Sequence, residues 1–239
     1  MDTPGTRPAG RRPGWNFGHV VGCLVAGLVG SVLMVSIGQA LGGNAIATAT
    51  EPADLWMLAL SQVGLWAGLL GGPLVVSRRL GSGSLAEDFG LRFRARDVPW
   101  ALLGPALQVA ISVAYSPFVS DDDVGKVARD LAGRADGSPV QFAMIVLATV
   151  VGAPVVEELF FRGMFLRLLR WRLGAVGSVI VCGIAFGLFH FEALQLPALA
   201  VFGMITAILA LWTGRLGPSV WLHVGFNAST MAVLAFEMF

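Results

Sequence analysis

The chain has 239 residues, of which 56% are hydrophobic and 13% are charged, whereas an average soluble domain carries about 25% charged residues. This composition excludes an ordinary soluble protein and predicts an all-α, polytopic transmembrane bundle of about seven helices. The formal net charge is +1, so nothing in the charge balance indicates a nucleic-acid partner, and the lipid bilayer is the expected environment.

Three parts follow one another along the chain. Residues 1–18 are rich in Pro, Gly and Arg and should form a disordered cytoplasmic tail. Residues 19–139 should hold N-terminal transmembrane helices with interfacial connectors, and residues 140–239 a helical core. The apolar run from Val20 to Leu41 is longer than the core of a signal peptide, so we expect an uncleaved first span.

Seven apolar runs approach the twenty or so residues that cross a bilayer. They are 19–41, 55–76, 98–119, 140–166, 176–191, 197–213 and 218–238. Arginines gather in the tail and in alternate loops, while the 42–54 and 120–139 loops are acidic or mixed. Positively charged loops stay on the cytoplasmic side, which predicts a cytoplasmic N-terminus and an external C-terminus.

Two connectors should lie at the membrane surface instead of crossing it. Leu85 to Val98 alternates apolar and basic residues and is expected at the cytoplasmic headgroup level. Asp97, with Pro99 behind it, is a candidate N-cap for the third span. Asp121 to Gly137 has the pattern of a short external amphipathic helix.

The fourth span contains ionisable side chains. An ionisable residue at the centre of a membrane helix costs roughly 2.5–3.5 kcal/mol on insertion scales, so such residues usually serve a function. Glu158 and Arg162 have the i, i+4 spacing of an intrahelical ion pair. Glu157 projects about 100° away and has no local counter-charge. Pro154, one turn earlier, cannot donate to the carbonyl of Val150 and should bend the helix.

Two later spans carry further polar residues at the same spacing. Phe186 and His190 share one helix face, and so do His223 and Asn227. Counted from the cytoplasmic arginines at about 1.5 Å per residue, these residues and Glu157 reach a similar depth. Independent packing residues would have no reason to agree in depth, so the spacing predicts one common site.

These residues resemble the three ordered motifs of the CPBP intramembrane glutamic endopeptidases, also called CAAX prenyl protease type II, abortive-infection or bacteriocin-processing proteins. The motifs are Glu157-Glu158-x-x-x-Arg162, Phe186-x-x-x-His190 and His223-x-x-x-Asn227. The resemblance covers roughly residues 140–235. It implies an endopeptidase of a bacterial plasma membrane that hydrolyses a peptide bond in a membrane-associated protein or peptide, without a cofactor.

The resemblance also implies a role for each motif residue. Glu157 would be the general base and His190 would help to hold and polarise the water. His223 and Asn227 would stabilise the oxyanion. Three further residues would support the site: Glu158, Arg162 and Phe186.

Other readings of the same residues stay open. Glu157, His190 and His223 could form a three-ligand catalytic zinc site, although the chain has no HExxH motif and Asn227 would then have no role. A catalytically silent protein of the same fold could act in bacteriocin self-immunity or partner binding. A small transporter would need inverted repeats with discontinuous helices, which the sequence does not show.

Overall fold

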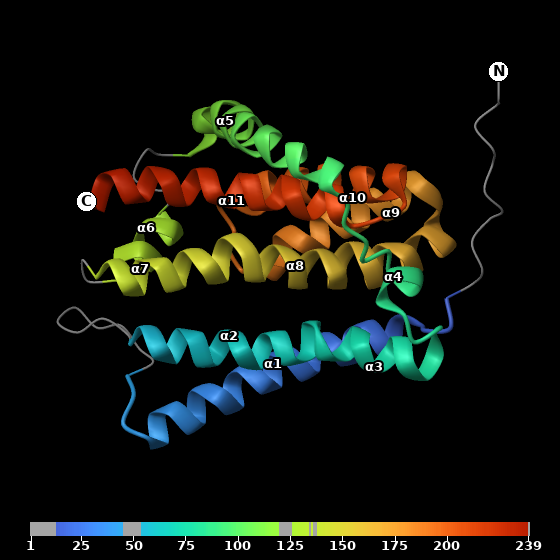
Figure 1. Cartoon of the computed structure of the whole chain (residues 1–239), viewed down its shortest axis with the longest axis horizontal. Helices are drawn as coiled ribbons and strands as arrows, with labels where there is room; N and C mark the ends of the chain where they lie inside the picture. The colour runs from blue at the N-terminus through green and yellow to red at the C-terminus, as the bar shows by residue number, and fades with distance from the viewer. Residues whose placement is uncertain (1–12, 45–53, 120–125, 134, 136–137, 239) are drawn as a thin grey trace.

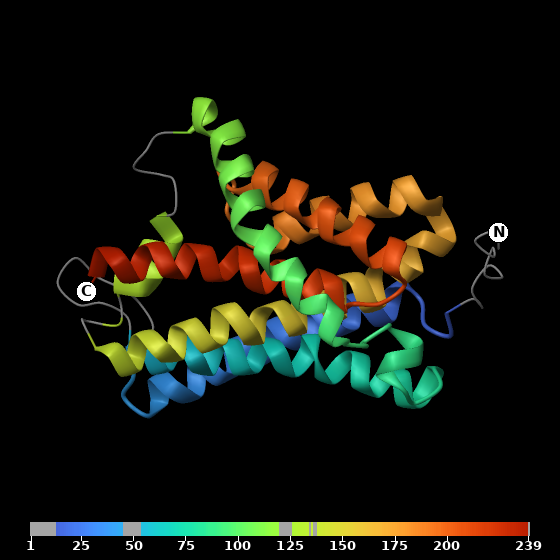
Figure 2. The same ribbon diagram turned by 45° about the horizontal axis from the view of Figure 1, so that its top comes forward.

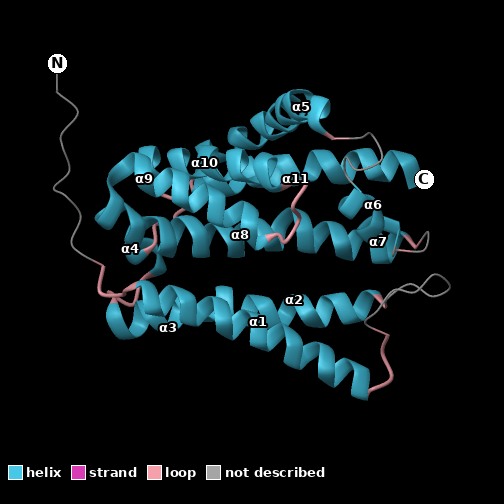
Figure 3. Ribbon diagram, turned by 180° about the vertical axis from the view of Figure 1, so that it is seen from behind, coloured by secondary structure: helices cyan, strands magenta, loops and turns pink. Residues whose placement is uncertain are grey.

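The computed structural model describes residues 13–44, 54–119, 126–133, 135 and 138–238, and these residues form helices and loops without a strand (Figures 1 and 3). The all-α fold class is confirmed. The elements are α1 (Phe17–Ala40), α2 (Leu55–Leu69), α3 (Gly71–Leu80), α4 (Leu85–Asp88), η1 (Ala95–Leu102), α5 (Leu103–Tyr115), η2 (Ser116–Phe118), α6 (Lys126–Gly133), α7 (Pro139–Val146), η3 (Leu147–Gly152), α8 (Ala153–Glu157), η4 (Glu158–Phe165), α9 (Leu166–Phe189), α10 (Leu196–Thr213) and α11 (Gly217–Met238).

Six segments of the described chain are long and apolar enough to cross a membrane, and the chain is a multi-pass membrane protein. The fourth segment, Pro139–Phe189, has 51 residues and would be about 76 Å long as one helix, against about 30 Å of hydrocarbon. It is broken at Gly174, whose φ of +71° and ψ of −170° are not helical. The chain turns back there (Figure 2), so this segment contains the predicted fourth and fifth spans.

The fourth span is the centre of the bundle. In Figure 1, α7 and α8 run between the group α1–α3 on one side and α9–α11 on the other. Every residue of η4 is buried, including Glu158 and Arg162. Charged side chains on this helix therefore contact protein on several sides instead of lipid, which lowers the cost of placing them in a membrane.

The last residues of the predicted tail, from residue 13 on, have a defined structure. Residues 1–12 lie outside the described residues, but Trp15 is only 6% exposed. Its indole Nε1 donates a hydrogen bond to the carbonyl of Met164 at 3.2 Å, and its ring packs edge-on against Phe89 with centroids 4.9 Å apart. A large aromatic side chain with a satisfied N–H gains enough from burial to order the residues just before α1.

The connector between the second and third spans contains α4 and η1. Asp97 was predicted to be the N-cap of the third span. It is instead the third residue of η1, which begins after Arg94. Its carboxylate accepts a hydrogen bond from the backbone N–H of Arg94 at 2.9 Å and forms an ion pair with Arg215. Of the predicted external segment 121–137, α6 is described and contacts α11; residues 121–125, 134, 136 and 137 lie outside the described residues.

Glycines set the closest helix crossings. On α5, Gly104 lies against Gly225 and Phe226 of α11, and a Cβ added at Gly225 would overlap the carbonyl oxygen of Ala101. Small residues let membrane helices approach until their backbones touch, which is the main source of packing attraction in lipid. This crossing holds α11, the helix that carries His223 and Asn227, close to α5.

Gly225→Ala should destabilise the protein by about 1–3 kcal/mol, because a side chain at this crossing forces α11 away from the end of η1 that leads into α5. Thermal unfolding of purified protein in detergent measures the effect. Gly22→Ala is the matched control, since an added Cβ at Gly22 on α1 meets no atom within 4 Å. Equal melting temperatures for Gly225→Ala and the wild type would contradict the proposed crossing.

Candidate active site

Two π-helical turns interrupt the central helix. These are η3 before α8 and η4 after it; Glu157 is the last residue of α8 and Glu158 is the first of η4. A π turn pairs each N–H with the carbonyl five residues back, and such turns are frequent at functional sites. They also loosen the pairing of nearby carbonyls, which then become available to side-chain donors.

One of these carbonyls is freed by Pro154. The N–H of Ala153 bonds to the carbonyl of Ala148, five residues back, as in a π-helix. In the same pattern, the carbonyl of Thr149 would accept a hydrogen bond from the backbone nitrogen of Pro154. Proline has no N–H. The side-chain amide of Asn227 donates to the carbonyl of Thr149 instead, at 2.8 Å. With α-helical pairing, the carbonyl that loses its partner would be that of Val150, as the sequence predicted. The π-helical pairing moves this loss to Thr149, one residue earlier.

Glu158, Arg162 and His223 form a buried charged cluster. The predicted ion pair between Arg162 and Glu158 is confirmed, with Nη1 and Oε1 3.2 Å apart and both side chains fully buried. The same Oε1 accepts a hydrogen bond from His223 Nδ1 at 3.1 Å. The guanidinium also donates to the carbonyl of Gly203 at 3.3 Å and lies 4.2 Å from the centre of the Phe186 ring.

Glu157 faces His223 from the other side. The Glu157 side chain is 14% exposed, and its Oε2 lies 3.9 Å from His223 Nε2. This distance is too long for a direct hydrogen bond, but one water molecule can contact both atoms. The imidazole of His223 is therefore placed between two carboxylates, with Nδ1 toward Glu158 and Nε2 toward Glu157.

His190 joins the cluster through Phe186. It caps the C-terminus of α9, and its Nδ1 donates to the carbonyl of Phe186 at 2.8 Å. The Phe186 ring lies between the two histidines, with its centroid 4.7 Å from that of His190 and 5.9 Å from that of His223. Because Nδ1 must carry the hydrogen of this bond, a neutral His190 has its lone pair on Nε2.

Three contacts in the site come from residues that the sequence did not single out. The ring of Phe202 packs against His223 with centroids 4.9 Å apart, Gly203 supplies the carbonyl for Arg162, and Thr149 supplies the carbonyl for Asn227. Phe202 and Gly203 lie on α10, an apolar helix with no polar motif. Only the pairing of helices in space shows that they belong to the site.

A catalytic zinc site needs three ligands grouped around one ion. Among the described side chains, no three of His, Cys, Asp or Glu are grouped closely enough to hold a metal ion. Glu157 and His223 approach each other, whereas His190 hydrogen-bonds to the backbone of Phe186 and packs against its ring. The zinc alternative therefore has no described ligand set, and the absence of a cofactor stays a prediction.

Comparison with known proteins supports the family. Residues 139–229 match the family model described as "Type II CAAX prenyl endopeptidase Rce1-like". This range contains all three motifs and the whole charged cluster. No curated protein and no solved structure was found to match the chain. Over these residues the chain is similar to the Rce1-like type II CAAX prenyl endopeptidases.

Proposed function

We propose that this chain, which carries that family's domain over residues 139–229, is an intramembrane endopeptidase of the glutamic type. Its substrate would be a membrane-associated protein or peptide. The observation that supports this function best is the position of His223, held by Glu158 on one nitrogen and facing Glu157 across a water-sized gap on the other. Peptide hydrolysis needs such a place, where a water can be bound and deprotonated.

In the first step, Glu157 takes a proton from a water held in this gap, and the oxygen of that water attacks the scissile carbonyl. The Glu158–Arg162 pair holds His223 in place, because Glu158 accepts Nδ1–H and is itself fixed by the guanidinium. His190 can accept a hydrogen bond from the same water through Nε2, since its Nδ1 is committed to the carbonyl of Phe186.

In the second step, the tetrahedral intermediate carries a negative oxygen that needs donors. Asn227 has two amide hydrogens and uses one for the carbonyl of Thr149, which leaves the other for the oxyanion. His223 can donate through Nε2 when both of its nitrogens are protonated. The proton on Glu157 then passes to the leaving nitrogen, and the peptide bond breaks.

The proposed setting is the plasma membrane of a bacterium, with the N-terminus in the cytoplasm. The beginning of α1 and the end of α11 lie at opposite ends of the bundle, as an odd number of crossings requires (Figures 1 and 2). The end of α3 and the whole of α4 lie at the end of the bundle where α1 begins (Figure 1), and the chain from the end of α3 to η1 carries Arg78, Arg79, Arg92, Arg94 and Arg96. By the positive-inside rule this end would face the cytoplasm.

Proteolysis by the purified protein tests the function. Reconstituted in liposomes and given a library of membrane-anchored peptides, the wild type should cleave at least one sequence. His190→Ala should reduce kcat for that peptide by about 10²–10³, because the water loses one of its partners. His19→Ala at the start of α1, whose imidazole bonds to Asn16 and makes no contact with the cluster residues, is the matched control and should cleave at the wild-type rate.

The same assay decides between the open alternatives. A chelator should leave the cleavage rate unchanged. Loss of activity with the chelator and recovery with zinc would favour the metalloprotease instead. A correctly folded protein that cleaves no peptide of the library, lipidated or not, would contradict the proposed function and favour a catalytically silent protein.

A further inference from the structure

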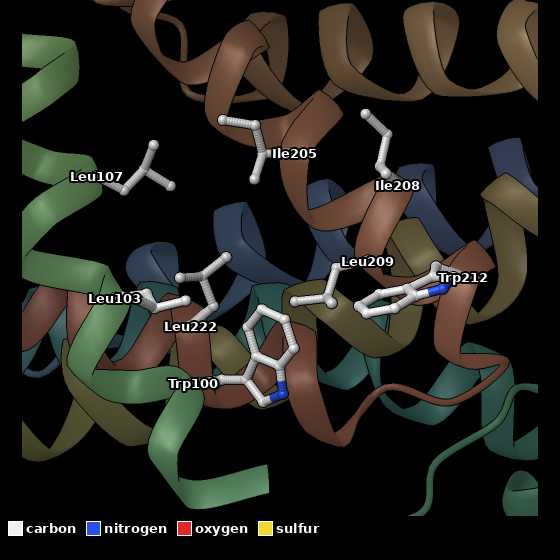
Figure 4. A pocket seen from close by; sticks show the side chains of 8 residues that line it. All are labelled: Trp100, Leu103, Leu107, Ile205, Ile208, Leu209, Trp212 and Leu222. Atoms are coloured by element: carbon white, nitrogen blue, oxygen red, sulfur yellow. The ribbon is translucent and has the colours of Figure 1, made fainter.

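An apolar groove lies on the outer side of the bundle, away from the carboxylates. It has a volume of about 320 Å³ and lies between η1 and α5 on one side and α10 on the other, with α11 as its floor (Figure 4). Eight side chains line it: Trp100, Leu103, Leu107, Ile205, Ile208, Leu209, Trp212 and Leu222. All but the two indoles are purely aliphatic, so the groove offers water almost no hydrogen-bonding partner.

The groove opens toward the surrounding membrane. Ile208 is 56% exposed and Trp212 is 75% exposed, whereas Leu222 on the floor is buried. Lining residues follow one another by about one helical turn on α5 and on α10, so the groove runs along α5 for about 6 Å and along α10 for about 10 Å. A hollow of this shape in the hydrocarbon region is filled by a flexible apolar chain, because an empty one loses dispersion contacts along its walls.

Aromatic and basic residues mark one end of the groove. The rings of Trp100 and Trp212 meet edge to face there, with centroids 6.3 Å apart. Tryptophan is enriched at the level of the lipid headgroups. Arg94 and Arg96 lie within two turns before Trp100 and are exposed, and the ion pair of Asp97 with Arg215 ties this end of η1 to the chain just after α10.

We propose that this groove is a binding site for one anionic phospholipid. One acyl chain lies between α5 and α10, and the phosphate lies beside the indoles, where Arg94 and Arg96 attract it. A zwitterionic lipid would fill the groove equally well but would gain less from the two arginines, each of which strengthens binding to an anionic surface by roughly fivefold. Selectivity for the headgroup is therefore the property that identifies the site.

Photo-crosslinking in nanodiscs tests the proposal without any need for proteolytic activity. The full-length wild type is reconstituted with a trace of phosphatidylglycerol or phosphatidylcholine that carries a diazirine in one acyl chain. Labelled positions are then identified by mass spectrometry. The face of α1 around Val32, which is 65% exposed, gives the baseline for ordinary lipid contact.

We expect the groove residues Leu103, Ile205 and Ile208 to be labelled by the phosphatidylglycerol probe at least about fivefold more than by the phosphatidylcholine probe. Val32 should show no such preference. Arg94→Gln with Arg96→Gln should remove the preference in the groove. Arg78→Gln with Arg79→Gln is the matched control, because these exposed arginines end α3 on the other side of the bundle, and it should keep the preference.

Four outcomes would overturn the proposal. The groove could be labelled no more than Val32, or equally by both probes, or the preference could survive the Arg94 and Arg96 exchanges. A lipidated peptide that displaces the phospholipid probe from the groove would also overturn it and assign the groove to substrate. A protein that binds the lipid but cleaves nothing would instead count against the endopeptidase alone.

Discussion

Glu157→Gln is expected to reduce peptide cleavage by at least about 10³ in kcat while the protein stays folded. Glutamine has the shape of glutamate but cannot accept a proton from water, so the step that generates the nucleophile is lost. The exchange should be tolerated structurally, because Glu157 is partly exposed and its distance to His223 Nε2 is 3.9 Å, which is beyond a direct hydrogen bond.

The cleavage assay in liposomes, combined with thermal unfolding, measures both halves of this expectation. Glu87→Gln on the exposed side of α4 is the matched control and should retain full activity. If Glu157→Gln cleaves as fast as the wild type, the general base is a different residue. A large fall in the melting temperature would instead make Glu157 a structural residue.

Arg162→Met should have the largest effect on stability, a loss of about 3–5 kcal/mol. Arg162 and Glu158 are both fully buried, and removal of one partner leaves the other charge without compensation. The guanidinium also holds the carbonyl of Gly203 and lies over the ring of Phe186, so three contacts disappear together. We expect low yields from membranes and early unfolding in detergent.

A second exchange separates the loss of charge balance from the loss of packing. Adding Glu158→Gln to Arg162→Met removes the unpaired carboxylate and should recover part of the lost stability. Arg170→Met is the matched control, since Arg170 is exposed and its exchange should leave the melting temperature unchanged. A double variant that is less stable than Arg162→Met would show that Glu158 is needed for His223 and not for Arg162.

Several features of the molecule follow from short stretches of sequence. Helical spans depend on runs of apolar residues, and the hydrocarbon thickness sets their length, so they could be predicted one at a time. The ion pair of Glu158 with Arg162 depends only on the i, i+4 spacing within one helix. The all-helical fold and the charged pair were therefore predictable before any packing was known.

The partners across helices were not predictable in the same way. The sequence placed His223 as a donor to the substrate, and the structure places its Nδ1 on Glu158. Asp97 was read as a local cap, but its carboxylate also pairs with Arg215, 118 positions later in the chain. Such contacts depend on how two helices cross, and an apolar lipid-facing pattern does not specify the crossing.

The sequence by itself predicted which residues carry the chemistry, namely Glu157, His190, His223 and Asn227, and it fixed their spacing along each helix. Only the tertiary structure decided how they are paired. Pro154 shows the reason, because its missing N–H frees a carbonyl in any helix, but the π register makes this carbonyl that of Thr149 and packing brings Asn227 to it. Spacing along one helix is set by local backbone geometry, whereas contacts between helices are set by the close fit of distant segments.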